Sequence, residues 1–341
     1  MKRMSAAAWR VSFAVLLGVG LAAQSPPPAP PVTPLPFDQW LAELRVEAED
    51  RGLPPDLLDR AFADIQPVEQ ILERDRTQAE FTLDLEQYLE RRLTRATVRT
   101  AQQMHTKHRA LLGRIEKQYG VPSRVLVSVW GLESNFGRFA GVRPTIPTLV
   151  TLAYDARRGA MFRSELFSAL EIVHRGDIEL ENLKGSWAGA LGQPQFMPSS
   201  YLQFAQDFDG DGRKDIWTST PDVFASVANY LQHYGWKAGA RWGREVRIPR
   251  AREEAALALP RRGTGCRARR QLTEPKPLVE WRAFGLRTTR GSALPAADLP
   301  ASLVMAGQRS FLVYDNYDAL LGYNCAHSYT LSVALLSDLL D

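Results

Sequence analysis

Residues 122–137 read PSRVLVSVWGLESNFG, and this stretch predicts the central helix of the fold. Pro122 is well placed to start a helix, because a proline at the first helical position loses no hydrogen bond. Glu133 follows Leu126 by seven residues and Val129 by four, so a helix places its carboxylate on the buried apolar stripe. Burial disfavours a charged carboxylate and raises its pKa. A general acid that cleaves glycosidic bonds needs this property.

The residues after Glu133 predict the end of this helix. Asn135 and Gly137 can both adopt the left-handed backbone conformation that terminates helices. We therefore expect a cleft to open beside the carboxylate. Taken alone, the pattern leaves a second interpretation open, because a buried glutamate can also serve only as the partner of an arginine.

The stretch at residues 185–201 reads GSWAGALGQPQFMPSSY and has the composition of a carbohydrate-binding loop. Its small residues allow a ligand to approach the backbone closely. Its serine and glutamine side chains offer neutral hydrogen bonds, and its aromatic residues offer flat apolar surfaces. Binding sites for sugars combine these two kinds of group.

Several linked motifs, in this order along the chain, resemble the B-type lytic murein transglycosylases, a family related in fold to goose-type lysozyme. The motifs are residues 131–137, 185–201, 207–217 and 226–230, followed by Tyr323 and Asn324 with Tyr329. The resemblance extends from Phe37 to the C-terminus. It implies an α+β fold that is mainly α, with a lysozyme-like helical core, an N-terminal helical region and a small inserted antiparallel β subdomain.

The resemblance also implies roles for individual residues. Glu133 is implied to be the catalytic acid. The implied glycan-binding residues are Ser186, Gln195, Phe196, Tyr230, Tyr323, Asn324 and Tyr329. Core packing is the alternative interpretation for the tyrosines. Many relatives have a basic residue and then a serine after the asparagine, where this chain has Cys325 and Ala326, so the role of that hydroxyl does not carry over.

The reaction implied by the resemblance is lytic cleavage of the β-1,4 bond between N-acetylmuramic acid and N-acetylglucosamine, which leaves 1,6-anhydromuramic acid ends. Most glycosidases use two carboxylates. The next acidic residue after Glu133 is Asp155, and residues 185–201 contain none, so one carboxylate is expected to suffice, with no catalytic cofactor. Two alternatives remain open: a hydrolytic muramidase that recruits Asp155 or Glu165, and a non-catalytic protein that binds peptidoglycan strands.

Residues 207–215 read DFDGDGRKD and match the spacing of an EF-hand calcium loop. Positions 1, 3, 5, 7 and 9 of such a loop are occupied by Asp207, Asp209, Asp211, Arg213 and Asp215. Position 12 is Thr218 instead of glutamate, and the family resemblance offers a longer loop closed by Asp222. We expect a structural Ca²⁺ site, with a solvated acidic turn as the alternative.

The first residues predict export from the cytoplasm. Lys2, Arg3 and Arg10 precede an uncharged run at 11–23, which is typical of a signal peptide at residues 1–23. An uncleaved anchor is the alternative, although the run is shorter than the roughly 20 residues that span a membrane. No cysteine lies near the cleavage region, so we expect a soluble periplasmic or secreted protein without a stable membrane anchor. Cleavage lowers the formal net charge from +4 to +1, which gives no indication of a nucleic-acid partner.

The rest of the chain divides by its sequence pattern. With 45% hydrophobic and 23% charged residues it is an ordinary globular chain. The predicted divisions are a proline-rich linker at 24–36, an N-terminal helical region at 37–120, a lysozyme-like catalytic core with the EF-hand-like loop at 121–241, a β subdomain at 242–317 and a helical segment at 318–341 that returns to the core. Within them we expect helices near 77–92 and 94–119, and strands at 245–248, 279–287, 302–305 and 310–313.

Two features of the β subdomain concern its contacts. Its arginine cluster is predicted to be a solvated loop, with contact to an anionic polymer as the alternative; the members are Arg261, Arg262, Arg267, Arg269 and Arg270. The only cysteines of the chain are Cys266 and Cys325. Because an exported protein folds under oxidising conditions, we expect a disulfide between them, the alternative being two unpaired apolar side chains.

Overall fold

The computed structural model describes residues 35–76, 83–155 and 157–340. The protein is mainly helical with a small antiparallel sheet, which confirms the predicted fold class. The predicted signal peptide and residues 24–34 of the predicted linker lie outside the described residues. Among the residues that are described, no helix combines the length and the apolar character needed to cross a membrane.

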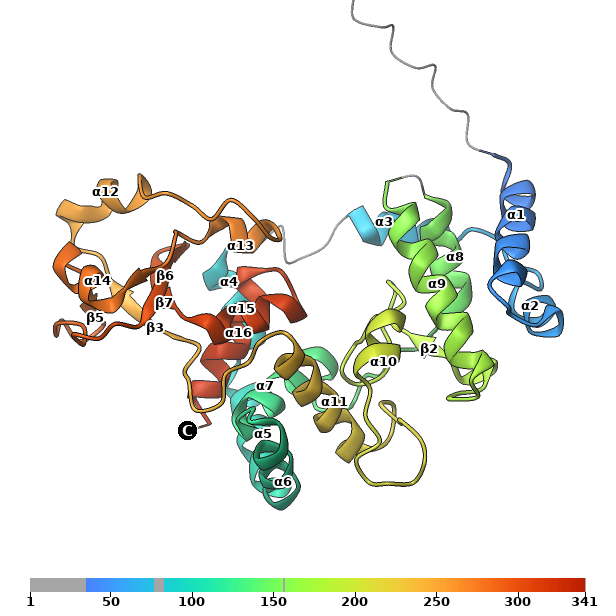
Figure 1. The fold of residues 1–341 in the computed structure, drawn as a ribbon, viewed down its shortest axis with the longest axis horizontal. Helices are drawn as coiled ribbons and strands as arrows, with labels where there is room; N and C mark the ends of the chain where they lie inside the picture. The colour runs from blue at the N-terminus through green and yellow to red at the C-terminus, as the bar shows by residue number, and fades with distance from the viewer. Residues whose placement is uncertain (1–34, 77–82, 156, 341) are drawn as a thin grey trace, which may run out of the picture.

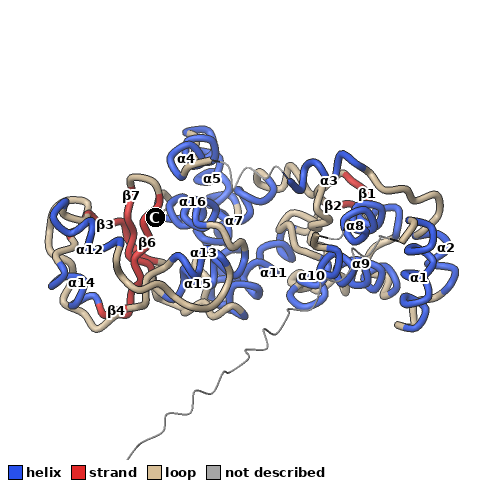
Figure 2. The backbone as a smooth tube through the Cα atoms, turned by 90° about the horizontal axis from the view of Figure 1, so that it is seen from above, coloured by secondary structure: helices blue, strands red, loops and turns tan. Residues whose placement is uncertain are grey.

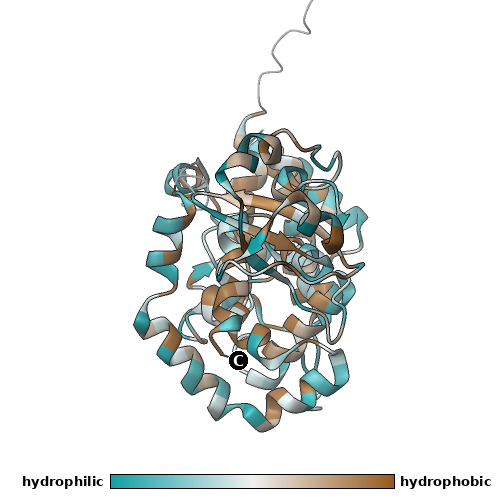
Figure 3. Ribbon diagram, turned by 90° about the vertical axis from the view of Figure 1, so that its left-hand side faces the viewer, coloured by the Kyte–Doolittle hydropathy of each residue, from teal (hydrophilic) through white to brown (hydrophobic). Residues whose placement is uncertain are grey.

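The molecule is elongated and has three parts in a row (Figures 1 and 2). The β subdomain lies at one end, a group of central helices follows, and a helical lobe that contains the start of the described chain lies at the other end. Seen from the side of the β subdomain, the helices carry bands of hydrophobic and hydrophilic residues (Figure 3), as amphipathic helices do.

The helical lobe has its own hydrophobic core. Its helices are α1 (Phe37–Asp50), α2 (Pro55–Ala61), α3 (Glu69–Arg76), α8 (Thr145–Tyr154), α9 (Gly159–His174) and α10 (Pro198–Phe204). Leu44, Leu58, Leu149 and Phe162 are almost fully buried between these helices. The lobe is therefore built from two parts of the chain, one that precedes the first group of central helices in the sequence and one that follows it.

The central core forms around α7 (Ser123–Ser134), in which every residue from 125 to 132 is buried. The helices packed around it are α4 (Leu85–Arg92), α5 (Arg95–Lys107), α6 (Arg109–Tyr119), α11 (Thr220–His233), α15 (Asp315–Tyr323) and α16 (His327–Asp338). Residues 37–120, which the sequence grouped as one N-terminal region, thus divide between two cores. The predicted helix at 94–119 is interrupted at His108, whose ring packs edge-on against Trp130 and Phe224.

The β subdomain contains a five-stranded antiparallel sheet in the order β4-β6-β7-β3-β5. The strands are β3 (Gly243–Arg247), β4 (Lys276–Pro277), β5 (Arg287–Thr288), β6 (Pro300–Ala306) and β7 (Arg309–Val313). In the β6–β7 hairpin Leu303 pairs with Leu312, and both side chains are fully buried. Short helices accompany the sheet: α12 (Glu253–Leu257), α13 (Arg267–Gln271) and α14 (Leu278–Phe284).

Three of the four predicted strands are confirmed, in β3, β6 and β7. The strand predicted at 279–287 is wrong, because most of this segment forms α14. Leu278 and Trp281 lie three residues apart and are both buried, which is the spacing of one helical face. Gly285 then ends the helix in the left-handed conformation, with φ 104°.

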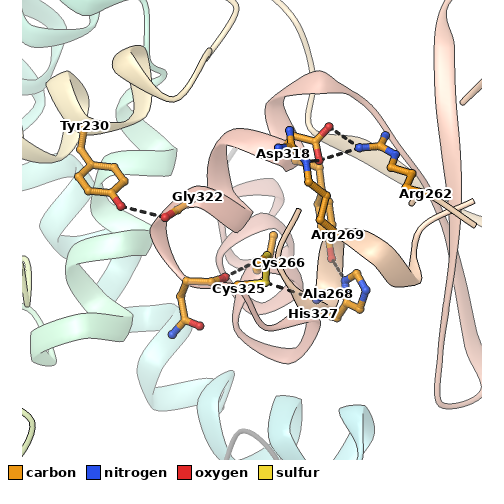
Figure 4. The surroundings of a disulfide bond; sticks show 12 residues. Tyr230, Arg262, Cys266, Ala268, Arg269, Asp318, Gly322, Cys325 and His327 are labelled. Atoms are coloured by element: carbon orange, nitrogen blue, oxygen red, sulfur yellow. Dashed lines mark hydrogen bonds and ion pairs between the residues drawn. A yellow bond between two sulfur atoms is a disulfide. The ribbon is translucent and has the colours of Figure 1, made fainter. Parts of the chain in front are cut away.

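The β subdomain is joined to the central core beside the turn between α15 and α16 (Figure 4). A disulfide joins Cys266, at the start of α13, to Cys325 in that turn. Close to it, Asp318 of α15 accepts hydrogen bonds from Arg262 at 2.7 Å and Arg269 at 3.1 Å. Both arginines are therefore paired at this joint. The prediction of a solvated arginine is wrong for Arg262, whose side chain is 18% exposed, whereas the side chain of Arg269 is 46% exposed.

Removing the disulfide should destabilise the protein. It joins two residues 59 positions apart in the sequence, and for a loop of this length the chain-entropy model gives about 4 kcal/mol. We expect the double substitution Cys266→Ser, Cys325→Ser to lower the free energy of unfolding by roughly 2–4 kcal/mol in urea titration. A reducing agent should lower the stability of the unsubstituted protein to the same level and leave the variant unchanged. Equal stability of the oxidised and reduced protein would contradict the expectation.

Candidate active site

The helix α7 ends in an abrupt reversal of the chain. Asn135, Phe136 and Gly137 are three consecutive residues in the left-handed region, with φ of 50°, 59° and 80°. The Ser134 hydroxyl stabilises the reversal, since it donates to the Trp130 carbonyl at 2.9 Å and accepts from the Gly137 N–H at 3.0 Å. Two non-glycine residues at positive φ are costly, so the turn depends on its packing.

Phe136 supplies that packing by folding back on the helix. A Cβ atom added to Gly131 would lie 2.5 Å from the Phe136 ring, so only a glycine fits beneath it. The same ring contacts Trp130 edge-on, with a centroid distance of 5.8 Å. Trp130 and Gly131 before Glu133 thus pack against Phe136 in the left-handed turn after it, which fixes the backbone on both sides of Glu133.

Glu133 itself lies where the buried part of α7 ends. Its neighbours Leu132 and Ser134 are buried, whereas Glu133 is only half-buried. The sequence places its carboxylate on the buried stripe of α7, and the structure puts Glu133 at the end of that stripe, where burial is only partial. The apolar run of α7 ends at Leu132, and Glu133 is the one residue of the last turn that is not buried.

Three tyrosines surround the Glu133 carboxylate. Tyr230 comes from α11, Tyr323 from the end of α15 and Tyr329 from α16. Burial raises the pKa of each phenol above its usual value, and the negative charge of Glu133 raises it further. All three side chains are therefore neutral hydroxyls at neutral pH.

The tyrosine hydroxyls are held by the backbone of other segments. Tyr230 donates to the Gly322 carbonyl at 2.8 Å (Figure 4), and Tyr323 donates to the Pro194 carbonyl at 2.6 Å. The second bond connects the C-terminal segment to the loop at 185–201. The hydroxyl of Tyr329 is buried, which raises its pKa, and the charge of the Glu133 carboxylate and a hydrogen bond to it raise that pKa further.

Phe196 extends this aromatic group into the loop at 185–201. Its ring centroid lies 5.3 Å from that of Tyr230 and 5.9 Å from that of Tyr323. Tyr323 and Tyr329 are stacked at 6.5 Å. The structure thus brings together five of the residues proposed from the sequence: Glu133, Phe196, Tyr230, Tyr323 and Tyr329.

The other three residues lie in the loop at 185–201 and directly after α15. Ser186 accepts hydrogen bonds from the N–H groups of Ala188 and Ala190, which leaves its own proton to donate. Gln195 is half-buried in the left-handed conformation, with φ 53°, and donates to the Gly192 carbonyl at 2.8 Å. Asn324 follows α15 directly, between Tyr323 and the disulfide.

The acidic loop lies between α10 and α11. Carboxylate oxygens of Asp207, Asp209 and Asp211 lie within 4.8 Å of one another, and all three residues are exposed. Asp222 lies beneath the loop with 0% exposure, and burial raises its pKa. It closes the loop by accepting hydrogen bonds from the N–H groups of Phe208 at 2.8 Å and Asp215 at 2.9 Å.

Sequence reasoning missed two residues that contact α7. Arg92 of α4 donates to the carbonyl of Leu132, so it satisfies one of the last carbonyls of the helix with a positive charge. Gln193 binds the indole of Trp130 and is buried. Gln193 lies in the loop already identified, but nothing in its local sequence signals a partner 63 residues away.

Comparison with known proteins agrees with this arrangement. The family described as "Transglycosylase SLT domain" matches residues 36–338. Membrane-bound lytic murein transglycosylase B of Escherichia coli is 42% identical over 129 residues, which cover 38% of this chain and 36% of that protein. The chain thus spans little more than a third of that relative.

Two solved structures cover most of the chain. SltB3 of Pseudomonas aeruginosa, in complex with NAG-anhNAM-pentapeptide, is 40% identical with a TM-score of 0.80 and covers 90% of this chain and 80% of its own. The E. coli lytic transglycosylase SLT35, in complex with calcium, is 25% identical with a TM-score of 0.74 and covers 89% of this chain and 92% of its own.

Substituting Gly131 should damage the site, whereas a matched glycine elsewhere should tolerate the change. Gly131→Ala forces the Phe136 ring off the helix, and we expect a loss of roughly 1–3 kcal/mol in the free energy of unfolding. Gly113 of α6 is exposed, and a Cβ there meets nothing within 4 Å. Gly113→Ala should therefore stabilise by about 0.5–1 kcal/mol. Equal effects of the two substitutions in denaturant titration would refute the proposed packing.

Proposed function

The chain belongs to the transglycosylase SLT domain family, and from this premise we propose that it is a lytic transglycosylase of peptidoglycan. It cleaves the β-1,4 bond between N-acetylmuramic acid and N-acetylglucosamine and leaves 1,6-anhydromuramic acid ends. The observation that carries the proposal is the position of Glu133, a half-buried residue in the last turn of a buried helix, beside three neutral tyrosine hydroxyls.

Glu133 transfers a proton twice in this reaction. As an acid it protonates the oxygen of the glycosidic bond, and the bond to C1 of the muramyl residue breaks. As a base the resulting carboxylate then takes the proton of the muramyl C6 hydroxyl while that oxygen attacks C1. The atoms balance without water, because the C6 oxygen replaces the leaving group. One positioned carboxylate can perform both steps in sequence.

The hydrogen bonds of Glu165 and Asp155, the other candidate carboxylates, support a reaction that uses a single carboxylate. Glu165 is held at the start of α10, where it accepts hydrogen bonds from the N–H and the hydroxyl of Ser199 at 2.9 and 2.7 Å. Asp155 accepts a hydrogen bond from the N–H of Arg157 in the turn after α8. A hydrolytic muramidase would need one of them at the bond that is cleaved.

The glycan strand is bound, in this proposal, along the loop at 185–201 and the aromatic group. Phe196, Tyr230, Tyr323 and Tyr329 supply the apolar wall beside Glu133, while Ser186, Gln195 and Asn324 supply neutral polar groups. The complexes of SltB3 with NAG-anhNAM-pentapeptide and NAG-NAM-pentapeptide support peptidoglycan as the ligand class. The signal-peptide pattern of residues 1–23 supports a reaction outside the cytoplasm, in the periplasm or beyond.

The acidic loop is proposed to hold a structural Ca²⁺ ion. Its carboxylates suit a cation that prefers oxygen ligands, and three of them already lie close together. Asp207, Asp209 and Asp211 would bind the ion, with Arg213, Asp215 and Asp222 as the further candidates from the loop spacing. The calcium complex of SLT35 supports this assignment. The ion would hold the loop and would take no part in proton transfer.

Glu133→Gln should abolish turnover while the fold persists. A glutamine cannot transfer the proton, and loss of an essential acid–base group costs roughly 10²–10⁴-fold or more in rate. Release of anhydromuropeptides from purified sacculi, followed by mass spectrometry, measures the rate. Glu165→Gln and Asp155→Asn are the controls and should retain turnover with the same products. Activity of Glu133→Gln above about a hundredth of the unsubstituted rate would contradict the assignment.

The inactive variant also separates the two other candidate functions. A muramidase would lose activity in one of the control variants and would release reducing ends. A protein that only binds peptidoglycan would show no turnover before substitution, and Glu133→Gln would leave its binding to sacculi unchanged.

Calcium should stabilise the protein through the acidic loop. Without a cation, three neighbouring carboxylates repel one another, and an ion at a hundredfold excess over its Kd contributes about 2.7 kcal/mol. We expect Ca²⁺ to raise Tm and a chelator to reverse the change. The substitution Asp209→Asn, Asp211→Asn should abolish the response, while Asp298→Asn, at an exposed carboxylate of the β subdomain, should retain it. The same Tm with Ca²⁺ and with chelator would rule the site out.

A further inference from the structure

Gln193 connects the helix that carries Glu133 to the acidic loop. Its side chain is 7% exposed and both ends of its amide are used. The Oε1 atom accepts a hydrogen bond from Nε1 of Trp130 at 2.7 Å, and Nε2 donates to the carbonyl of Trp217 at 2.7 Å. One buried amide therefore bridges two segments that are far apart in the sequence.

At its first end, Gln193 contacts the chain on both sides of Glu133. Trp130 precedes Glu133 by three residues, about one turn of α7. Gly137 follows the helix, and a Cβ atom there would lie 2.6 Å from Oε1 of Gln193. The amide thus lies against the last turn of the helix and against the reversal that ends it.

At its second end, Gln193 is fixed to the end of the acidic loop. Its backbone N–H donates to the carbonyl of Ile216 at 2.9 Å, in addition to the side-chain bond to Trp217. Ile216 is fully buried, and a Cβ atom on the neighbouring Gly192 would meet its carbonyl at 2.6 Å. The segment at 192–193 and the segment at 216–217 are therefore in close, directional contact.

We propose that Gln193 is a positioning residue for catalysis: by holding Trp130 it sets the orientation of the last turn of α7, and with it the direction of the Glu133 carboxylate. This inference rests on the proposed function. Because Gln193 is buried and bonded to the Trp130 indole, it would act through that indole and not on the substrate. Hydrogen bonds between buried groups are directional and costly to leave unmade, so the bridge transmits the position of the acidic loop to the helix.

The test removes the bridge from each end. Gln193→Met keeps a similar volume and loses both side-chain hydrogen bonds, and Trp130→Phe keeps an aromatic ring and loses the donor. Displacement of a catalytic group by about 1 Å can cost on the order of 100-fold in rate. We expect each variant to lower kcat roughly 10- to 100-fold and to change KM less than about threefold. The double variant should be no slower than the slower single variant, because both substitutions break the same link.

A matched control distinguishes positioning from general loss of stability. Trp281 of the β subdomain is fully buried, and its Nε1 donates to the Ala301 carbonyl at 2.9 Å. Trp281→Phe therefore removes the same kind of hydrogen bond far from Glu133, and it should lower Tm while kcat stays unchanged. The inference is overturned if Gln193→Met keeps kcat, if Trp281→Phe loses kcat equally, or if the two losses in the double variant multiply.

A second readout does not depend on activity. Hydrogen exchange of the amides in residues 131–137, including the Gly137 N–H that binds Ser134, should accelerate in Gln193→Met and Trp130→Phe but not in Trp281→Phe. Unchanged exchange in the first two variants would show that the bridge does not hold the turn. If the unsubstituted protein released no anhydro product, the proposed function would fail, and the exchange data would still decide whether Gln193 fixes α7.

Discussion

The burial of helix α7 is the constraint on which the rest of the structure depends. Residues 125–132 are enclosed on all sides by the central core, so the helix cannot shift without opening a close-packed interior. Its end is then set by the left-handed residues Asn135–Gly137, with Phe136 packed over Gly131. The backbone of Glu133 is therefore fixed by the core, while its side chain is only half-buried and lies beside Tyr230, Tyr323 and Tyr329. A group that is rigid in position and accessible to a ligand is suited to proton transfer, because little reorganisation is needed at the moment of reaction.

The wall opposite Glu133 is assembled from segments that are distant in the sequence, and each must be held in place. Tyr230 and Tyr323 donate hydrogen bonds to the carbonyls of Gly322 and Pro194, so the C-terminal segment is attached both to α11 and to the loop at 185–201. The disulfide at Cys325 and the ion pairs of Asp318 join the same segment to the β subdomain. The β subdomain thus fixes the segment that carries Tyr323 and Tyr329, although it contributes no residue to the aromatic group beside Glu133.

Much of the site could be predicted because its signals are local. The periodicity of α7, the left-handed turn and the composition of residues 185–201 each lie within a short stretch. The extent of the core could not be read in this way: periodicity identified the face that carries Glu133 but not the point at which packing over that face ends. The strand predicted at 279–287 is wrong because it was inferred from the β-rich composition of the surrounding segments. Gly285, which ends the helix α14, was the local signal for a helix. The role of Gln193 could not be predicted, because its partners Trp130 and Trp217 lie 63 and 24 residues away and only the folded chain brings them together.

The central claim is that Glu133 cleaves the glycan strand alone, with the C6 hydroxyl of the substrate in place of water. Isotope incorporation tests this claim most directly. Purified sacculi would be digested with the unsubstituted protein in water enriched in heavy oxygen, and the masses of the released muropeptides would be compared with those formed in ordinary water. The account predicts anhydro products whose masses are identical in the two solvents, because no water oxygen enters the product. Products that carry one heavy oxygen at a reducing end would show that water attacks C1 and would contradict the mechanism.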